Sequence, residues 1–214
     1  MLSKEIQLFK KICDIIQPER GAVEMKLYHG TDKEIQAGEY LNPQKNWIDG
    51  KEEKEKTHAV FATPLLNWAQ CFAFCRAVEK GLCKISPMDT GFLIVSNNCL
   101  PFDDAKDTKI FVYELPTKGF ARSNPEKKGG VEEYISHGPV KVMQTVAETT
   151  VGELLKSGYI KLYTVPDEIM KQTWGNKNIK AADIINNPEY NAQIYYDFNK
   201  ALFMQQAVMI KDRI

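Results

Sequence analysis

A histidine and a glycine stand side by side near the start of the chain, in the run Leu-Tyr-His-Gly-Thr that ends at Thr31. Gly30 has no Cβ, so a flat ligand can approach its backbone closely. The backbone N–H and C=O of Gly30 could bind a carboxamide, which offers one donor group and one acceptor. A lone histidine beside a glycine usually bonds a carbonyl oxygen and serves structure only. A chemical role for His29 therefore requires partners elsewhere in the chain.

Two phenylalanines supply the first partners. Phe61 and Phe72 are 11 residues apart, with Phe61 in a predicted strand and Phe72 on the predicted helix that follows. This spacing can bring two rings face to face across a gap that admits a third ring, and aromatic faces attract cations. Most phenylalanines simply pack in a core, so the pair gains meaning only beside His29 and Gly30.

A glutamate late in the chain supplies a carboxylate. Glu133 follows the pair Gly129-Gly130 and opens a predicted strand. A carboxylate beside a sugar can bond a hydroxyl and stabilise the oxocarbenium-like charge that forms when a leaving group departs. Together, the histidine, the aromatic pair and the glutamate predict a site that breaks a glycosidic bond to a flat cationic ring.

Apolar runs predict the strands and the helix that hold these residues. A strand over residues 25–28 leads into His29, and a buried strand over 59–63 carries Phe61. A helix over 65–80 carries Phe72 on its inward face. Further strands are predicted over 92–95, 110–115, 134–135 and 140–142, the last two paired with each other.

Both ends of the chain are predicted to be helical. Residues 3–17 have helical spacing, which defines an N-terminal helix within residues 1–22. After about residue 150 the runs 151–157, 166–172, 180–185 and 190–210 favour helices. We therefore predict an α+β fold, with a core over residues 23–148 and a helical C-terminal extension over residues 149–214.

The three segments, in this order, resemble the signature of the ADP-ribosyltransferase superfamily, in the His–Tyr–Glu branch that includes diphtheria toxin and the poly(ADP-ribose) polymerases. Tyr28–Thr31 is similar to the histidine element, Phe61-Ala62-Thr63 with Phe72 to the aromatic element, and Glu133-Tyr134-Ile135 to the glutamate element. Residues 29–43 and 139–142 also resemble rifamycin-modifying ADP-ribosyltransferases. The resemblance covers residues 25–145, roughly, and leaves both ends of the chain unexplained.

The resemblance implies a split β-sandwich of two small sheets with flanking helices, and NAD as the donor of ADP-ribose. It implies that Glu133 is the catalytic carboxylate and that His29, the second catalytic residue, bonds the nicotinamide ribose or its neighbouring hydroxyls. Gly30 would hold the carboxamide, and Phe61 and Phe72 would stack on the nicotinamide. The full set of residues assigned to NAD binding is His29, Gly30, Thr31, Phe61, Ala62 and Phe72.

The chain departs from the family pattern at two places. Phe61 stands where the family usually has tyrosine, so a hydroxyl contact is lost while stacking can survive. Glu133 also differs from the rifamycin enzymes, whose acidic residue is an aspartate elsewhere in the loop. Arginine-modifying relatives need a second acid two positions before the glutamate, and Val131 stands there, so modification of arginine is disfavoured.

The resemblance predicts a mono-ADP-ribosyltransferase that cleaves NAD and passes ADP-ribose to a macromolecular acceptor, either protein or nucleic acid. NAD glycohydrolase activity and transfer to a small molecule such as an antibiotic are alternatives within the same enzyme class. A non-catalytic module that binds NAD or ADP-ribose is an alternative of another class, and Phe61 is the residue that favours it. A purely structural interaction domain would bind no NAD.

Bulk composition leaves the acceptor open and predicts a cytoplasmic protein with no membrane partner. The chain of 214 residues has 28 Lys plus Arg and 28 Asp plus Glu, so its net charge points to neither nucleic acid nor acidic membrane. Five cysteines, an odd number, indicate free thiols in a reducing compartment. No apolar run approaches the roughly 20 residues of a membrane helix. An effector exported into a host cell by a dedicated apparatus would have the same composition.

The cysteines also raise the question of a metal. Cys71 and Cys75 are four residues apart on the predicted helix, with Cys83 and His58 in the surrounding sequence. Zinc sites usually show tighter pairs such as C-x2-C, and cysteines on a buried helical face act as small hydrophobes. We therefore predict no metal site.

Overall fold

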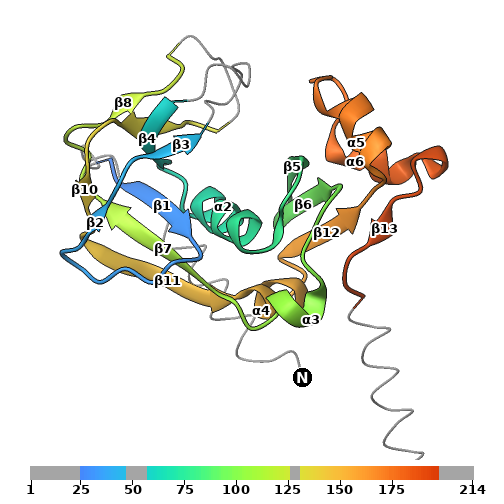
Figure 1. The fold of residues 1–214 in the computed structure, drawn as a ribbon, viewed down its shortest axis with the longest axis horizontal. Helices are drawn as coiled ribbons and strands as arrows, with labels where there is room; N and C mark the ends of the chain where they lie inside the picture. Colours follow the sequence, from blue (N-terminus) through green and yellow to red (C-terminus); the bar gives the residue numbers. More distant parts are fainter. Residues whose placement is uncertain (1–24, 47–56, 126–130, 198–214) are drawn as a thin grey trace, which may run out of the picture.

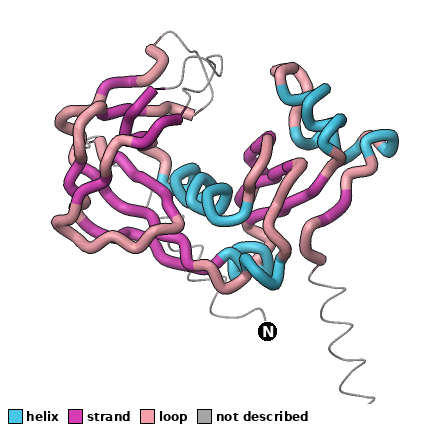
Figure 2. The backbone as a smooth tube through the Cα atoms, viewed as in Figure 1, coloured by secondary structure: helices cyan, strands magenta, loops and turns pink. Residues whose placement is uncertain are grey.

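The computed structural model describes residues 25–46, 57–125 and 131–197, and its strands lie on both sides of one central helix (Figures 1 and 2). The predicted helix within residues 1–22 lies outside the described residues. The central helix is α2, Leu66–Val78. The fold is α+β, as the sequence predicts.

Two small sheets and a short ribbon form one body of the molecule. The first sheet has the order β1-β7-β11, the second the order β3-β4-β9-β8, and the ribbon joins β2 to β10. Their bounds are β1 Leu27–Thr31, β7 Lys109–Leu115, β11 Gln144–Thr150, β3 Gln44–Asn46, β4 Thr57–Ala62, β9 Tyr134–Ser136, β8 Ala121–Arg122, β2 Tyr40–Leu41 and β10 Val140–Lys141. Among the described residues, an isolated bridge between Tyr28 and Thr63 connects the two sheets.

Helix α2 packs against β1 and β7 through its smallest side chains. Ala69 and Ala73 are fully buried, and they lie four residues apart, on one face of the helix. Gly30 of β1 faces them: a Cβ on this glycine would lie 1.7 Å from the Ala69 carbonyl oxygen. The close approach of helix and strand therefore depends on three residues with little or no side chain.

A third sheet lies on the other side of α2 and has the order β13-β12-β6-β5 (Figure 1). Its strands are β13 Gln193–Ile194, β12 Ile160–Thr164, β6 Gly91–Ser96 and β5 Cys83–Met88. The side chains of Phe92 and Ile94 enter a core with Phe74 of α2, whereas Leu93 and Val95 enter a second core on the opposite face. Because β6 is buried on both faces, it is a continuous apolar run rather than an alternating one.

Short helices pack against the third sheet and around α2. The second core of β6 is covered by α5, Asp167–Trp174, and α6, Ala181–Asn186. Two shorter helices, α3 at Phe102–Ala105 and α4 at Val151–Lys156, lie side by side below α2 (Figure 1). No helix among the described residues is long and apolar enough to cross a membrane.

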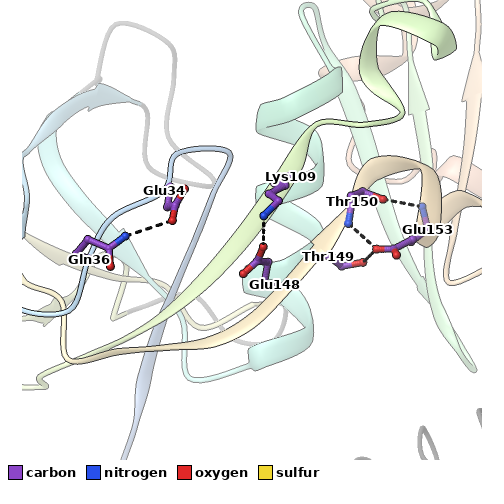
Figure 3. A network of polar contacts seen from close by, with 7 residues as sticks. All are labelled: Glu34, Gln36, Lys109, Glu148, Thr149, Thr150 and Glu153. Atoms are coloured by element: carbon purple, nitrogen blue, oxygen red, sulfur yellow. Dashed lines mark hydrogen bonds and ion pairs between the residues drawn. The ribbon is translucent and has the colours of Figure 1, made fainter.

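The start of α4 illustrates how local sequence sets an element boundary (Figure 3). The Glu153 amide donates to Thr150 Oγ1 at 3.2 Å, and the Thr150 amide donates back to Glu153 Oε2 at 2.9 Å. This reciprocal capping box satisfies two amides that a helix start leaves without partners. Just before it, Lys109 of β7 and Glu148 of β11 form an ion pair at 2.7 Å.

Several sequence predictions differ from the structure. Strands β5, β11 and β12 were not predicted, and β12 makes the segment from residue 149 only partly helical. The strands at 134–135 and 140–142 do not pair with each other, because β9 pairs with β4 and β8 while β10 pairs with β2.

The helix predicted over 190–210 is wrong in its described part. Residues Pro188–Tyr190 form one 3-10 turn and strand β13 follows. Asn191 adopts the left-handed conformation, with φ of 47°, and a residue in that conformation ends a helical turn. The remainder of that predicted helix, from residue 198, lies outside the described residues.

Candidate functional site

His29 makes the shortest contact between the histidine and aromatic segments. Its Nδ1 lies 2.7 Å from the Phe61 carbonyl oxygen. A carbonyl oxygen can only accept, so Nδ1 carries the proton that is donated. Burial lowers the pKa of His29, and the nearby positive charge of Arg76 lowers it further, although the bond to the Phe61 carbonyl raises it. The ring is therefore neutral at pH 7, and its Nε2 has a lone pair that can accept a hydrogen bond.

The strands that carry these two residues separate where His29 lies. The Tyr28 amide donates to the Thr63 carbonyl at 2.8 Å, and the Thr63 amide donates to the Tyr28 carbonyl at 3.0 Å. The next hydrogen-bonded pair along this antiparallel register would be Gly30 with Phe61. In the described chain, however, the pairing of β1 with this segment consists of the Tyr28–Thr63 bridge. We call the opening between residues 29–31 and residues 59–61 the β1–β4 split.

The backbone of Gly30 faces this split. In an antiparallel ladder the N–H and C=O of one residue point to the same edge of the strand, and those of the residue two positions on point the same way. Since the N–H and C=O of Tyr28 bond toward Thr63, those of Gly30 also point toward β4. The space of the missing side chain is filled by the α2 backbone rather than open to a ligand, so a ligand would reach Gly30 only through these two backbone groups.

Glu133 lies at the end of the second sheet, beside the Tyr28–Thr63 bridge. Strand β9 pairs Tyr134 with Ala62, so the same register places Glu133 next to Thr63. The Glu133 carbonyl accepts from the Ser123 amide at 2.9 Å, and its Oε1 is withdrawn from solvent. Neighbouring strands are about 4.8 Å apart, which puts the backbones of the histidine and glutamate segments about 10 Å apart. The structure thus brings all three sequence segments onto neighbouring strands.

The two phenylalanines are both half-buried. The Phe72 ring lies against Trp68 on its own helix, with centroids 5.7 Å apart and planes tilted by 42°. Trp68 in turn meets Phe92 of β6 edge-on at 4.8 Å. Trp68 is not among the residues predicted from the sequence, although residues four apart on a helix are neighbours and Phe72 therefore points to it.

Two other predicted binding residues have structural contacts. Thr31 is buried, and its Oγ1 accepts from the Lys33 amide at 3.2 Å in the turn after β1. Ala62 is buried in β4, where it pairs with Tyr134. Both residues border the β1–β4 split, and their side chains serve the packing around it.

Arg76 and Gln44 adjoin the same opening and were not predicted. Arg76 is exposed on α2, and its guanidinium Nη2 donates to Gln44 Oε1 at 3.0 Å. Gln44 belongs to β3 and pairs with Ala59 of β4, on the far side of the split from His29. No sequence pattern links these two residues, which are 32 positions apart.

The cysteines gather between α2 and the third sheet. Cys71, Cys75, Cys83 and Cys99 are free thiols. Contact with the Cys71 thiol and burial raise the pKa of Cys75, and contact with Cys75 and burial raise the pKa of Cys83, so both thiols are poor nucleophiles. Within residues 25–46, 57–125 and 131–197, no group of three or more His, Cys, Asp or Glu side chains is arranged to hold a metal ion.

A hollow of about 640 Å³ lies elsewhere, between α3, α4 and Tyr196. Its lining mixes Lys106 and Lys156 with acidic side chains such as Asp107 and Glu153. None of the residues from the three sequence segments lines it. We place the candidate site at the β1–β4 split, because the histidine, aromatic and glutamate segments converge there.

Comparisons of the chain with protein families, with curated proteins and with solved structures found no match.

Proposed function

We propose that this protein is a NAD-dependent mono-ADP-ribosyltransferase that works in the β1–β4 split. The observation that carries the proposal is the meeting of three distant segments at one place. His29 bonds the Phe61 carbonyl, and the register of β9 puts Glu133 beside Thr63, the residue that bridges to Tyr28. The order of these segments is also the order of the family signature that the sequence resembles.

Gly30 and the two phenylalanines would receive the nicotinamide. The N–H and C=O of Gly30 match the acceptor and donor of a carboxamide, and both point into the split. Phe61 and Phe72 are half-buried, which leaves part of each ring available for stacking on the cationic pyridinium. Stacking favours the charged ring before cleavage, so it serves binding more than bond breaking.

His29 would act as an acceptor for a ribose hydroxyl. Its Nδ1 is committed to the Phe61 carbonyl and its pKa is lowered by burial, so the Nε2 lone pair is the group that remains for a ligand. A hydroxyl that donates to Nε2 fixes the position of the sugar relative to the strands. A protonated ring would present a donor instead and would lose this contact.

Glu133 would stabilise the transition state. As the bond between the ribose carbon and the pyridinium nitrogen breaks, its electron pair neutralises the leaving nicotinamide and positive charge develops on the ribose. A carboxylate that bonds the 2′-hydroxyl stabilises that charge. An acceptor nucleophile then bonds to the ribose carbon and loses a proton. Water in its place gives free ADP-ribose, which is the glycohydrolase alternative.

The test compares two adjacent acids. Glu133→Gln should lower nicotinamide release from NAD by about 100-fold or more, the loss expected when one transition-state contact is removed. Glu132→Gln is the matched control, because Glu132 is exposed and pairs with Arg122 at 3.4 Å rather than facing the split. Release of nicotinamide is measured by chromatography. Cleavage by Glu133→Gln at the wild-type rate would contradict the assigned role.

A second assay separates the alternatives. Wild-type protein is incubated with cell lysate and NAD that is labelled in the adenine. Label on protein or nucleic acid supports transfer to a macromolecule, and free ADP-ribose alone supports hydrolysis. NAD that binds in calorimetry without any release of nicotinamide supports a non-catalytic binding module.

A further inference from the structure

One cation in the described part of the chain adjoins the β1–β4 split without a carboxylate partner. Arg76 lies three residues beyond Ala73 and seven beyond Ala69, so it shares the face of α2 that packs on Gly30. Its side chain is exposed and reaches across to Gln44 of β3, on the opposite side of the split. Arg76 lies near the C-terminal end of α2, and its side chain therefore extends from this helix across the β1–β4 split to β3.

The contact with Gln44 holds the guanidinium without neutralising it. An arginine has five N–H donors, and the amide oxygen of Gln44 accepts from Nη2 at 3.0 Å. The ion pairs made by residues 25–46, 57–125 and 131–197 do not include Arg76. The charge also lies close enough to His29 to lower the pKa of that ring. A full positive charge thus faces the same opening as His29 and Gly30.

We propose that Arg76 binds the pyrophosphate of the NAD donor, with Gln44 orienting the guanidinium; this inference rests on the proposed function. The planar fork of arginine matches two phosphate oxygens at once, and such charge-assisted bonds are about twice as strong as neutral ones. NAD has a nicotinamide end that Gly30 would hold and a dianionic centre that follows one ribose further on. Arg76, whose charge acts on the His29 ring, would meet that centre once the ribose lies against His29.

The test separates ligands that have phosphates from those that lack them. Calorimetry measures the binding of NAD, ADP-ribose and nicotinamide to the wild type and to Arg76→Ala. The variant should bind NAD and ADP-ribose about 10- to 100-fold more weakly, the loss expected for a hydrogen bond to a charged group. Its affinity for nicotinamide should not change. Gln44→Ala should give a smaller loss, because the guanidinium stays but is no longer oriented.

Lys161→Ala is the control for loss of one surface charge, since Lys161 is exposed on β12 in the third sheet. It should leave all three affinities unchanged. The dependence of ADP-ribose affinity on salt should be weaker in Arg76→Ala than in Lys161→Ala, because one ion contact is missing.

The outcomes distinguish this inference from the proposed function. Equal affinity of the wild type and Arg76→Ala for ADP-ribose overturns the inference, even if the wild type cleaves NAD. A loss of nicotinamide affinity as large as the loss for ADP-ribose also overturns it. Weaker ADP-ribose binding in Arg76→Ala, in a protein whose wild type releases no nicotinamide, supports the inference and contradicts the transferase. A wild type that binds neither NAD nor ADP-ribose overturns both.

Discussion

At the scale of single residues, the structural contact of His29 is compatible with the chemical role proposed for it. A histidine that donates to a backbone carbonyl is usually a packing residue. In this protein the same bond to the Phe61 carbonyl selects the tautomer and leaves Nε2 as an acceptor. The bond that fixes the His29 ring in the fold therefore also leaves free the acceptor that the proposed function requires.

The lowered pKa of His29 predicts a stability that falls with acid. Burial holds the folded-state pKa below the ordinary value of 6.5, so below that pH the unfolded chain binds more protons than the folded one. The free energy of unfolding should decrease as pH falls through 6.5 toward the folded-state pKa. His29→Asn keeps a donor for Phe61 without a titrating ring and should show a smaller decrease over this range.

Two measurements check this prediction. Urea unfolding at several pH values between 7.5 and 5 gives the difference in slope between wild type and His29→Asn. The ring resonances of His29, assigned by their absence in the variant, should titrate below pH 6.5. A titration midpoint above 6.5 would show that the ring is charged near neutrality and would remove Nε2 as an acceptor.

At the scale of elements, the contact between β1 and α2 depends on Gly30. From the sequence, this glycine is expected to permit the close approach of a ligand, whereas in the structure it permits the close approach of a helix. Both explanations use the same property, which is the absence of Cβ. Sequence alone could not choose between them, because nothing in a local run states which element will lie above it.

Gly30→Ala should destabilise the fold strongly. The new Cβ would lie 1.7 Å from the Ala69 carbonyl oxygen, which is helix backbone and cannot rotate away. We expect a loss of about 3 kcal/mol or more in the free energy of unfolding, the upper range for overpacking. Gly138→Ala is the matched control, since its Cβ would meet nothing within 4 Å and should change stability by less than about 1 kcal/mol. Equal denaturation midpoints for the two variants would show that α2 does not press on β1.

Strand pairing was the least predictable feature at this scale. The runs that form β4, β6 and β7 and the helix α2 were recognised, because burial on one or both faces leaves a strong apolar pattern. Strand β11 has the polar run Gln-Thr-Val-Ala-Glu-Thr-Thr and gives no such pattern. This segment forms a strand because it pairs with β7, and that pairing depends on the tertiary structure.

At the scale of the whole molecule, the segment after residue 149 is part of the folded core. Strand β12 pairs in parallel with β6, and Leu162 shares one buried cluster with Phe74 of α2. Parallel strands cannot be joined by a local turn, so β6 and β12 are joined by a long connection. The region 149–197 thus supports the helix that carries Phe72 and Arg76.

A chain that ends at residue 148 should therefore not fold cooperatively. Loss of β12 and α4 would uncover one edge of β6 and the apolar cluster beneath α2. We expect the shortened chain to lack a sharp urea transition and to exchange the amide hydrogens of α2 rapidly, while the full chain protects them. A cooperative transition in the shortened chain, with α2 still protected, would contradict this prediction and favour a core that ends before residue 149.

Sequence by itself identified the candidate residues for chemistry and most of the strongly apolar elements, because residue type and periodicity are local properties. It supplied His29, Phe61, Phe72 and Glu133 in an order that resembles one family. Only the tertiary structure decided that β1, β4 and β9 lie side by side, that Gly30 serves helix packing, and that Arg76 meets Gln44 across the β1–β4 split. These are contacts between segments distant in sequence, and their free energy depends on pairing and burial that no local pattern encodes.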